Sequence, residues 1–189
     1  TDLVFHPDPA ELYFPDAATW VEVPALAKNL CAKTRPTHFR GVCTVVSKLF
    51  HIAAPDKAFF GQKDAQQLAV IRRMVRDLNF DLEIVGCPIV READGLAKSS
   101  RNTYLNPKER QAALILNRSL KKGEALIETG ETDTGRLLAA IKESIATEPL
   151  ATLDYAEAVD ADSMKPVATV EGNVLFAIAV YIGKTRLID

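Results

Sequence analysis

The chain has 189 residues and a formal net charge of −2, and 48% of its residues are apolar while 25% are charged. This balance is typical of soluble globular proteins. The scattered Lys and Arg residues argue against a nucleic-acid partner, and no apolar run approaches the roughly 20 residues that cross a bilayer, which argues against a membrane partner.

The three cysteines, Cys31, Cys43 and Cys87, lie far apart in the sequence. Their odd number and the lack of a Cys-x-x-Cys or Cys/His spacing argue against a zinc site, so no protein ligands for a metal are expected. We expect buried free thiols in a reducing cytoplasm, and therefore a cytoplasmic protein.

The first predicted elements are short. An apolar run at residues 3–5 predicts a strand that is already under way at the first residue, which is not Met, so we expect the chain to begin in the middle of a fold. Alternating apolar and polar residues over 20–23 predict a second strand. Apolar side chains at helical spacing over 39–54 predict an amphipathic helix.

The clearest unit follows. Residues 57–60 are predicted to form a strand, 64–78 an amphipathic helix and 82–85 another strand. At this spacing the two strands are parallel and joined by a right-handed crossover. Ligands in such sheets bind at the carboxyl ends of the strands, where residues 61–64 lie.

Beyond Pro88 the pattern changes. Residues 90–102 are predicted to be a loop with a turn at Asp94-Gly95, and Pro107 starts a long helix that ends near Glu128. A helix from Asp133 to before Pro149 and strands over 155–159, 173–182 and 185–188 complete the chain. We therefore expect two domains, a parallel α/β domain over 1–88 and a small α+β domain with antiparallel strands over 89–189.

Two clusters combine small residues and positive charge in predicted turns. The first is Phe60-Gly61-Gln62-Lys63-Asp64, and the second is Lys98-Ser99-Ser100-Arg101-Asn102. Glycine lets a ligand approach the backbone, helix starts offer unpaired N–H groups, and Lys and Arg bind phosphate oxygens. Both clusters predict a polyphosphate site. The alternatives are a helix start with a solvated Lys for the first, and an ordinary polar loop for the second.

Individual polar residues are less informative. Asp64 either contacts a ribose hydroxyl or caps the helix, and Gln67, one turn after Lys63, is placed to bind a hydroxy acid. The alternative for Gln66 and Gln67 is simple helix surface. We expect structural roles for the three histidines, with nearby Arg35 and Arg40 keeping His38 neutral, and we expect salt bridges for Arg91, Glu92 and Asp94.

Residues 35–42 (RPTHFRGV), 60–68 (FGQKDAQQL), 91–102 (READGLAKSSRN) and 185–189 (TRLID) together closely resemble the pantothenate synthetase (pantoate–β-alanine ligase) family. This resemblance covers nearly the whole chain. It implies a Rossmann-like catalytic domain, here incomplete at the N-terminus, and ATP-dependent ligation of pantoate to β-alanine through a pantoyl-adenylate, with release of AMP and pyrophosphate. It also implies Mg²⁺ as a cofactor and a homodimer.

The resemblance assigns roles to single residues. The implied ATP-binding residues are Gly61, Gln62, Lys63, Asp64, Val90, Lys98, Ser99, Ser100 and Arg101. Among these, Lys63, Ser99, Ser100 and Arg101 would be catalytic, and Val90 would touch the adenine. Gln67 would hold pantoate.

The sequence departs from the family pattern in several places. Gln62 stands where Glu is usual, Ala65 where an aromatic residue is usual, and Lys98 where an apolar residue precedes the two serines. The family's N-terminal segment with its His-x-Gly-His motif is absent, so we expect this chain to be inactive by itself. Two alternatives stay open: a non-catalytic ATP-binding fragment, and another nucleotidyltransferase-superfamily enzyme with a different acceptor.

Overall fold

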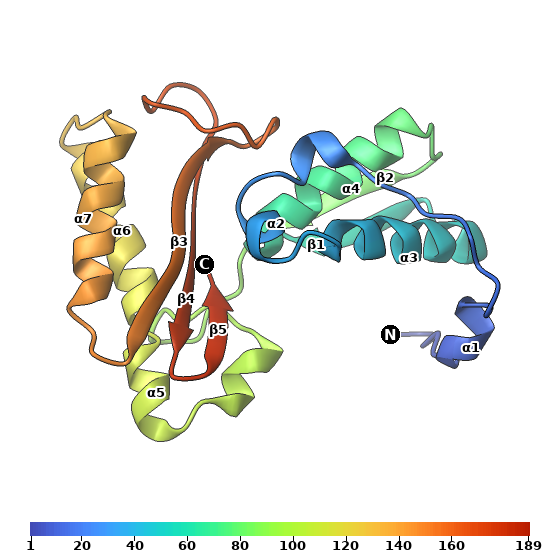
Figure 1. The fold of residues 1–189 in the computed structure, drawn as a ribbon, viewed down its shortest axis with the longest axis horizontal. Coiled ribbons are helices and arrows are strands. Elements are labelled where there is room, and N and C mark those ends of the chain that lie inside the picture. Colours follow the sequence, from blue (N-terminus) through green and yellow to red (C-terminus); the bar gives the residue numbers. More distant parts are fainter.

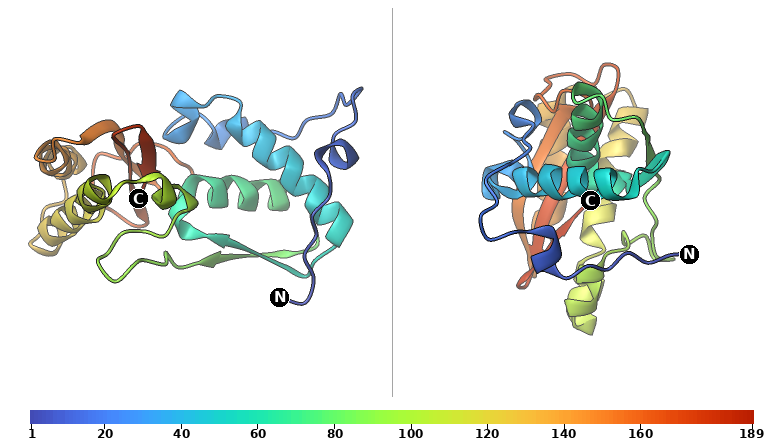
Figure 2. Two further views of the ribbon diagram at one scale, coloured as in Figure 1. Left: turned by 90° about the horizontal axis from the view of Figure 1, so that it is seen from below. Right: turned by 90° about the vertical axis from the view of Figure 1, so that its right-hand side faces the viewer.

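The computed structural model describes all residues, 1–189 (Figure 1). In the first half, β1 (Lys57–Gly61) and β2 (Glu83–Cys87) form a parallel two-stranded sheet in which Phe59 pairs with Val85. The helix α4 (Ala65–Asp77) connects the two strands, as the spacing of apolar residues predicts. It packs beside α3 (His38–Ala53) on the same side of the sheet, and the other side carries no helix (Figure 2).

The second half is an antiparallel sheet with helices on one side. Its strands β3 (Ala151–Asp160), β4 (Val174–Ile182) and β5 (Thr185–Ile188) follow the order β3-β4-β5. Before them come α5 (Pro107–Ala112), α6 (Ile115–Glu128) and α7 (Thr134–Ala146). The predicted fold class, a parallel α/β sheet followed by a small α+β part, is confirmed.

The strands β3 and β4 contact both halves, because their side chains alternate between the two faces of the sheet. Ala156 and Ile178 face α6 and α7 and belong to the core of the second half. Tyr155 and Ala177, each one residue away, pack against the core of the first half, because successive side chains of a strand point to opposite faces. Figure 1 shows the sheet between α6–α7 and the first half. The division of the chain into two domains at Pro88, residues 1–88 and 89–189, stays a prediction.

A short segment before α3 provides polar ties between the halves. The Asn29 side-chain amide donates to the Met164 carbonyl at 3.0 Å. The Cys31 thiol lies 3.2 Å from the Tyr155 hydroxyl, and Lys33 pairs with Glu157 at 2.8 Å. Cys31 and Lys33 lie in the single-turn helix α2 (Cys31–Thr34).

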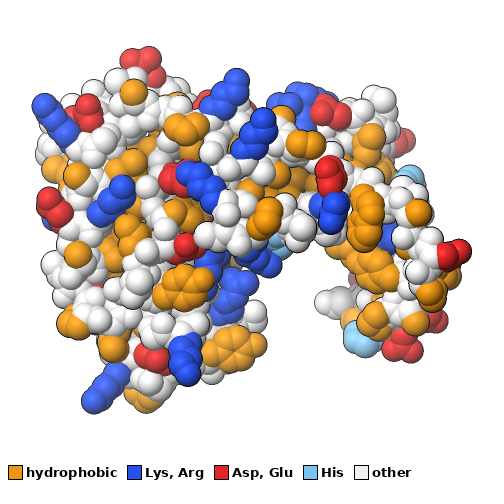
Figure 3. Space-filling view, viewed as in Figure 1, with side chains coloured by type: hydrophobic (Ala, Val, Ile, Leu, Met, Phe, Trp, Pro, Cys, Tyr) orange, Lys and Arg blue, Asp and Glu red, His pale blue; other side chains and the backbone are white.

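Two predicted strands are wrong. Residues 3–5 and 20–23 form no strand, because neither has a neighbouring strand in the chain to pair with. The segment that contains them includes α1 (Pro9–Leu12) and lies along the outer end of α3 (Figure 1). Its side chains Leu3 and Phe14 are 84% and 63% exposed, and Figure 3 shows hydrophobic side chains at the surface of this arm.

Two further predictions need correction. The helix expected over 107–128 is divided at Ala113–Leu114 into α5 and α6, although Pro107 does occupy the first turn of α5. All three cysteines are free, but Cys43 alone is fully buried, and burial raises its pKa to about 11.

No helix of the structure is both long and apolar enough to span a membrane.

Candidate active site

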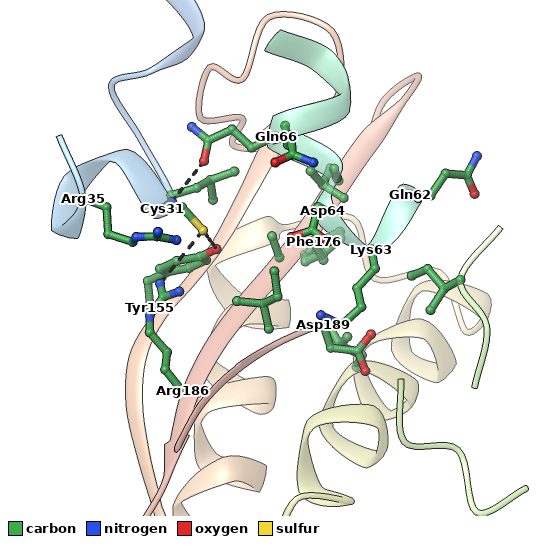
Figure 4. Close-up of a pocket in the computed structure, with 18 of the residues that line it drawn as sticks. Cys31, Arg35, Gln62, Lys63, Asp64, Gln66, Tyr155, Phe176, Arg186 and Asp189 are labelled. Atoms are coloured by element: carbon green, nitrogen blue, oxygen red, sulfur yellow. Dashed lines mark hydrogen bonds between the residues drawn. The ribbon is translucent and has the colours of Figure 1, made fainter. Parts of the chain in front are cut away.

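A cavity of about 320 Å³ lies at the carboxyl end of β1, where the first half meets the antiparallel sheet (Figure 4). The first half contributes Leu30, Cys31, Arg35, His38, Phe39 and residues 62–67. The connection between the halves contributes Ile89, Arg91 and Arg101. The second half contributes Leu120, Tyr155, residues 175–177, Arg186, Ile188 and Asp189. The position agrees with the sequence-based expectation that ligands bind at this edge of the sheet.

Three cationic side chains of the cavity have no anionic partner. Lys63, Arg101 and Arg35 all line it, and none of them takes part in an ion pair. Burial lowers the pKa of the Lys63 ammonium, while the carboxylates of Asp64 and Asp189 partly offset that effect. The cavity therefore holds positive charge that a bound anion would compensate.

The turn that carries Lys63 also leaves a carboxylate free. Gln62–Asp64 form a 3-10 turn between β1 and α4, and Asp64 stands at the N-cap position of α4. Its side chain accepts no hydrogen bond from the helix, so the capping alternative is wrong. The Asp64 carboxylate is available to a ligand in the cavity.

The two glutamines of α4 have different surroundings. Gln67 lines the cavity with Lys63, one helical turn away. Gln66 is 5% exposed, and its amide bonds the backbone of residues 26–31. The alternative that Gln66 lies on the helix surface is therefore wrong. The sequence did not indicate its buried hydrogen bonds.

The loop between the halves is folded into a small hairpin. The predicted turn is present: Gly95 N donates to Glu92 O at 2.9 Å, and Gly95 has φ +95°. A bridge joins Arg91 to Ala97, and Lys98 N donates to Val90 O at 2.9 Å. A side chain at Gly95 would also meet the Asn117 amide oxygen, at 2.7 Å from the Cβ. Glycine is therefore needed both for the backbone angle and for the approach of α6.

The second predicted cluster is split between two faces. Arg101 reaches the cavity, whereas Lys98, Ser99 and Ser100 line a separate, open hollow with Glu92. Lys98 is 3.9 Å from the Glu92 carboxylate. Val90 is 62% exposed and lines neither hollow. The structure thus brings Arg101 to Lys63, and it does not bring Lys98, Ser99, Ser100 or Val90 there.

Gly61 is the remaining residue of the first cluster. It ends β1 with an ordinary extended backbone, and a Cβ added there would meet no atom within 4 Å. It does not line the cavity. The space beside it is open, so the glycine is not explained by packing within this chain.

Two partly buried ion pairs lie beside the cavity. Arg91 donates two hydrogen bonds of 2.7 Å to Asp189, and Arg186 donates to Asp154 at 2.9 and 2.7 Å. The expected salt bridges of Glu92 and Asp94 are also present, with Lys98 and Arg110 respectively. Because Asp189 and Asp154 hold Arg91 and Arg186, these two cations are less available to a ligand than Lys63, Arg101 and Arg35.

Some lining residues had no sequence-based assignment to the site. His38 lies in the cavity, at the start of α3. Its pKa is lowered by burial first and by Arg35 next, so its neutral form is favoured, but Arg40 instead pairs with Glu22. Tyr155 comes from β3, and burial raises the pKa of its hydroxyl. The short spacing between Arg35 and His38 in the sequence was the signal that could have suggested that these two residues lie together at the site.

Comparison with known proteins identifies the family. The family model described as pantoate-beta-alanine ligase matches residues 1–189. The chain belongs to this family. It is 58% identical to the pantothenate synthetase of Clostridium acetobutylicum over 187 residues, which are 99% of this chain and 66% of that protein. The corresponding protein of Clostridium novyi is 59% identical, again with 66% of its length covered.

Solved structures of relatives have the same fold. The pantothenate synthetase of Thermus thermophilus superposes with a TM-score of 0.93 at 41% identity, over 100% of this chain and 68% of that one. The pantoate–β-alanine ligase of Francisella tularensis, complexed with beta-gamma ATP and β-alanine, gives a TM-score of 0.68 at 30% identity. That match covers 93% of this chain and 59% of the other. The present chain thus spans about two thirds of the length of the curated relatives named above.

Proposed function

We propose that the protein containing this chain joins pantoate to β-alanine at the expense of ATP, through a pantoyl-adenylate, releasing AMP and pyrophosphate. The observation that carries the proposal is the set of unpaired cations, Lys63, Arg101 and Arg35, that share one cavity with a free carboxylate and a free amide. Family membership and the β-alanine and ATP analogue named for the Francisella relative support the same reaction.

In this proposal the triphosphate lies against Lys63 and Arg101. When the pantoate carboxylate attacks the α-phosphorus, the bond from that phosphorus to the bridging oxygen breaks and pyrophosphate leaves. Negative charge grows on the phosphate oxygens, so fixed cations stabilise the transition state more than the ground state. Asp64 contacts the ribose, and Gln67 holds pantoate from the next turn of the helix.

In the second step the β-alanine amine attacks the acyl carbon of the adenylate. A carbon–nitrogen bond forms, the carbon–oxygen bond to the phosphate breaks, and AMP leaves. The amine loses a proton during the step. Burial of the cavity between the two halves protects the adenylate from hydrolysis by water.

The residues present fit Mg²⁺ that arrives with ATP. No group of three or more His, Cys, Asp and Glu side chains could hold a metal anywhere in the structure. Magnesium is commonly bound through substrate phosphates and waters, so it would be held here by the ATP phosphates beside Lys63 and Arg101, while Asp64 contacts the ribose. Bound magnesium would neutralise phosphate charge.

The remaining predicted roles belong to the same proposal. Lys98, Ser99 and Ser100 bind phosphate only if the loop turns toward Arg101, and Val90 contacts adenine only if the base extends beyond the cavity. Gly61 and Gln62 flank the nucleotide. A cytoplasmic homodimer completes the proposal, supported by the family resemblance and by the free thiols.

Isotope exchange between pyrophosphate and ATP tests the first step. We expect the complete protein to catalyse exchange when pantoate is present, with or without β-alanine. Exchange that does not require pantoate would point to a different acceptor within the superfamily. ATP binding with no exchange under any condition would point to a non-catalytic nucleotide-binding protein.

A further inference from the structure

The side chain of Gln66 makes three hydrogen bonds to one short stretch of backbone. Its Nε2 donates to Leu26 O at 3.0 Å and to Asn29 O at 2.8 Å, and its Oε1 accepts from Cys31 N at 3.1 Å. The residue is 5% exposed. Figure 4 shows the amide directed at the segment around Cys31, away from Lys63.

This pattern fixes the orientation of the amide. Both N–H donors point at carbonyl oxygens, and the amide oxygen points at an N–H. Rotating the amide by half a turn would place oxygen against two carbonyls and NH₂ against the Cys31 N–H, so all three bonds would be lost. An isosteric carboxylate cannot reproduce the pattern, because it has no donor when ionised and only one when protonated.

The stretch held by Gln66, residues 26–31, includes an unfavourable backbone conformation. Leu30 has φ +54° and ψ −129°, a region that favours glycine. Its side chain is nevertheless 1% exposed and lines the cavity. Burial of Leu30 and the hydrogen bonds of Gln66 offset the cost of this conformation.

The same stretch connects to the second half. Asn29 donates to Met164 O, and the Cys31 thiol lies beside the Tyr155 hydroxyl. Gln66 therefore links α4, which carries Gln67 and follows Lys63, to a cavity wall that contacts the antiparallel sheet.

We propose that Gln66 is a positioning residue that holds residues 26–31 as the cavity wall and thereby sets the distance between the α4 residues and the second half. The proposal rests on the proposed function only for its effect on turnover. Its effect on the wall is independent of any reaction. Although Gln66 is among the residues lining the cavity, its amide is engaged with the backbone of Leu26, Asn29 and Cys31, and it acts through that segment.

Alkylation of Cys31 tests the wall directly. In the complete protein, iodoacetamide labelling of each cysteine is followed by mass spectrometry for wild type, Gln66→Leu, Gln66→Glu and Val70→Ala. Val70 is a fully buried residue of the same helix and of the same apolar core as Leu26 and Leu30, and its side chain makes no hydrogen bond, so it controls for loss of core packing without loss of the Gln66 hydrogen bonds. Cys43, which is buried, reports global unfolding.

We expect Cys31 to label at least about fivefold faster in both Gln66 variants than in wild type, because losing buried hydrogen bonds frees the segment. Val70→Ala should leave the ratio of Cys31 to Cys43 labelling unchanged. Unchanged Cys31 labelling in Gln66→Leu and Gln66→Glu would overturn the proposal. If the Leu variant fails to fold, the Glu variant alone decides.

The Glu variant also provides a readout that a generally weakened fold would not give. Burial raises the pKa of a carboxyl group, and protonation restores one donor, so Cys31 labelling of this variant relative to wild type at the same pH should fall as the pH is lowered. Wild type at the same pH is the reference because it carries the same other charged and titratable groups around the cavity: Cys31, Arg35, His38, Lys63, Asp64, Tyr155, Arg186 and Asp189. A pH-independent ratio would contradict the proposed hydrogen-bond pattern.

Turnover separates this inference from the proposed function. In the Gln66 variants we expect KM for pantoate to rise about tenfold or more, with a smaller change in kcat, as expected for a displaced binding wall. A fall of kcat of about tenfold with an unchanged KM for pantoate would overturn the positioning role. If wild type itself shows no pantoate-dependent exchange, the proposed function fails, and the labelling result still decides the role of Gln66.

Discussion

The Arg91 guanidinium donates two parallel hydrogen bonds of 2.7 Å to the carboxylate of Asp189, whose side chain is 2% exposed. Arg91 follows β2 and Asp189 follows β5, so the pair joins the two halves beside the cavity. Arg91 also donates to Gly95 O at 3.1 Å, which connects the pair to the turn of the hairpin. This contact fixes where the segment leading to Arg101 leaves the sheet.

Arg91→Ala should therefore be strongly destabilising. It leaves a buried carboxylate without its partner, and breaking such a pair costs roughly 3 kcal/mol. Urea unfolding measures the loss. Arg76→Ala is the matched control, because Arg76 makes a similar pair with Asp77 at the surface and should change stability little. Equal effects of the two substitutions would contradict a structural role for the Arg91–Asp189 pair.

Lys63→Ala should reduce adenylate formation about 10²- to 10³-fold in the complete protein, because in the proposed reaction it removes a cation of the cavity that would face the developing phosphate charge. Arg101→Ala should act similarly. Pyrophosphate exchange measures the rate, and urea unfolding shows that the fold is intact. The control Lys57→Ala removes a lysine that pairs with Glu83 at the start of β1, away from the cavity, and should leave exchange unchanged. Near-normal exchange in Lys63→Ala would exclude the assigned role.

The pH dependence of ATP use should depend on Lys63. Burial lowers the pKa of its ammonium in the folded protein, so the group loses its proton below the usual lysine range of about 10.4. We expect kcat/KM for ATP to fall on the alkaline side as pH rises through that lowered pKa. Lys63→Arg keeps its charge, so its alkaline fall should move to higher pH. If the alkaline fall of kcat/KM for ATP occurs at the same pH in Lys63→Arg as in wild type, another group controls it.

The same shift has a consequence for stability. The unfolded chain binds the Lys63 proton more tightly than the folded chain does, so a charged Lys63 lowers the free energy of unfolding. This destabilisation decreases as the pH rises from the lowered pKa of the folded state toward the pKa of the unfolded state. Lys63→Met should accordingly raise the urea midpoint at about pH 7 while it removes activity. A lower midpoint would contradict the desolvation of Lys63.

Gly95→Ala should destabilise the hairpin for two reasons, the positive φ and the approach of Asn117. Gly130→Ala is a close control, since Gly130 has φ +98° but no atom near its added Cβ. We expect about 1 kcal/mol of destabilisation in the control and a larger loss at Gly95. Urea unfolding of the two variants gives the difference, and equal losses would show that Asn117 moves aside without cost.

The central strand–helix–strand unit was predictable because its signals are local. Apolar residues along α4, and short apolar runs for β1 and β2, each point to a single structure. The charged turn Gln62–Asp64 follows from the same pattern, and it does lie at the cavity. The antiparallel sheet and the hairpin turn at Gly95 were predictable for the same reason.

Other features depend on contacts that are distant in sequence. Residues 3–5 have strand-like side chains, but a strand needs a partner and the structure gives them none. At Ala113–Leu114 both residues are good helix formers, yet the helix is interrupted there, where both side chains are buried in the core of the second half. No local pattern could show that Gln66 is buried or that β5 brings Asp189 to Lys63.

We propose that this cavity belongs to an AMP-forming ligase. The most direct measurement is AMP release by the complete protein with ATP and magnesium, omitting pantoate and β-alanine in turn. The proposal predicts multiple turnovers of AMP only when both organic substrates are present, with one pantothenate formed per AMP. AMP release that does not depend on β-alanine, or none with both substrates and a folded protein, would contradict it.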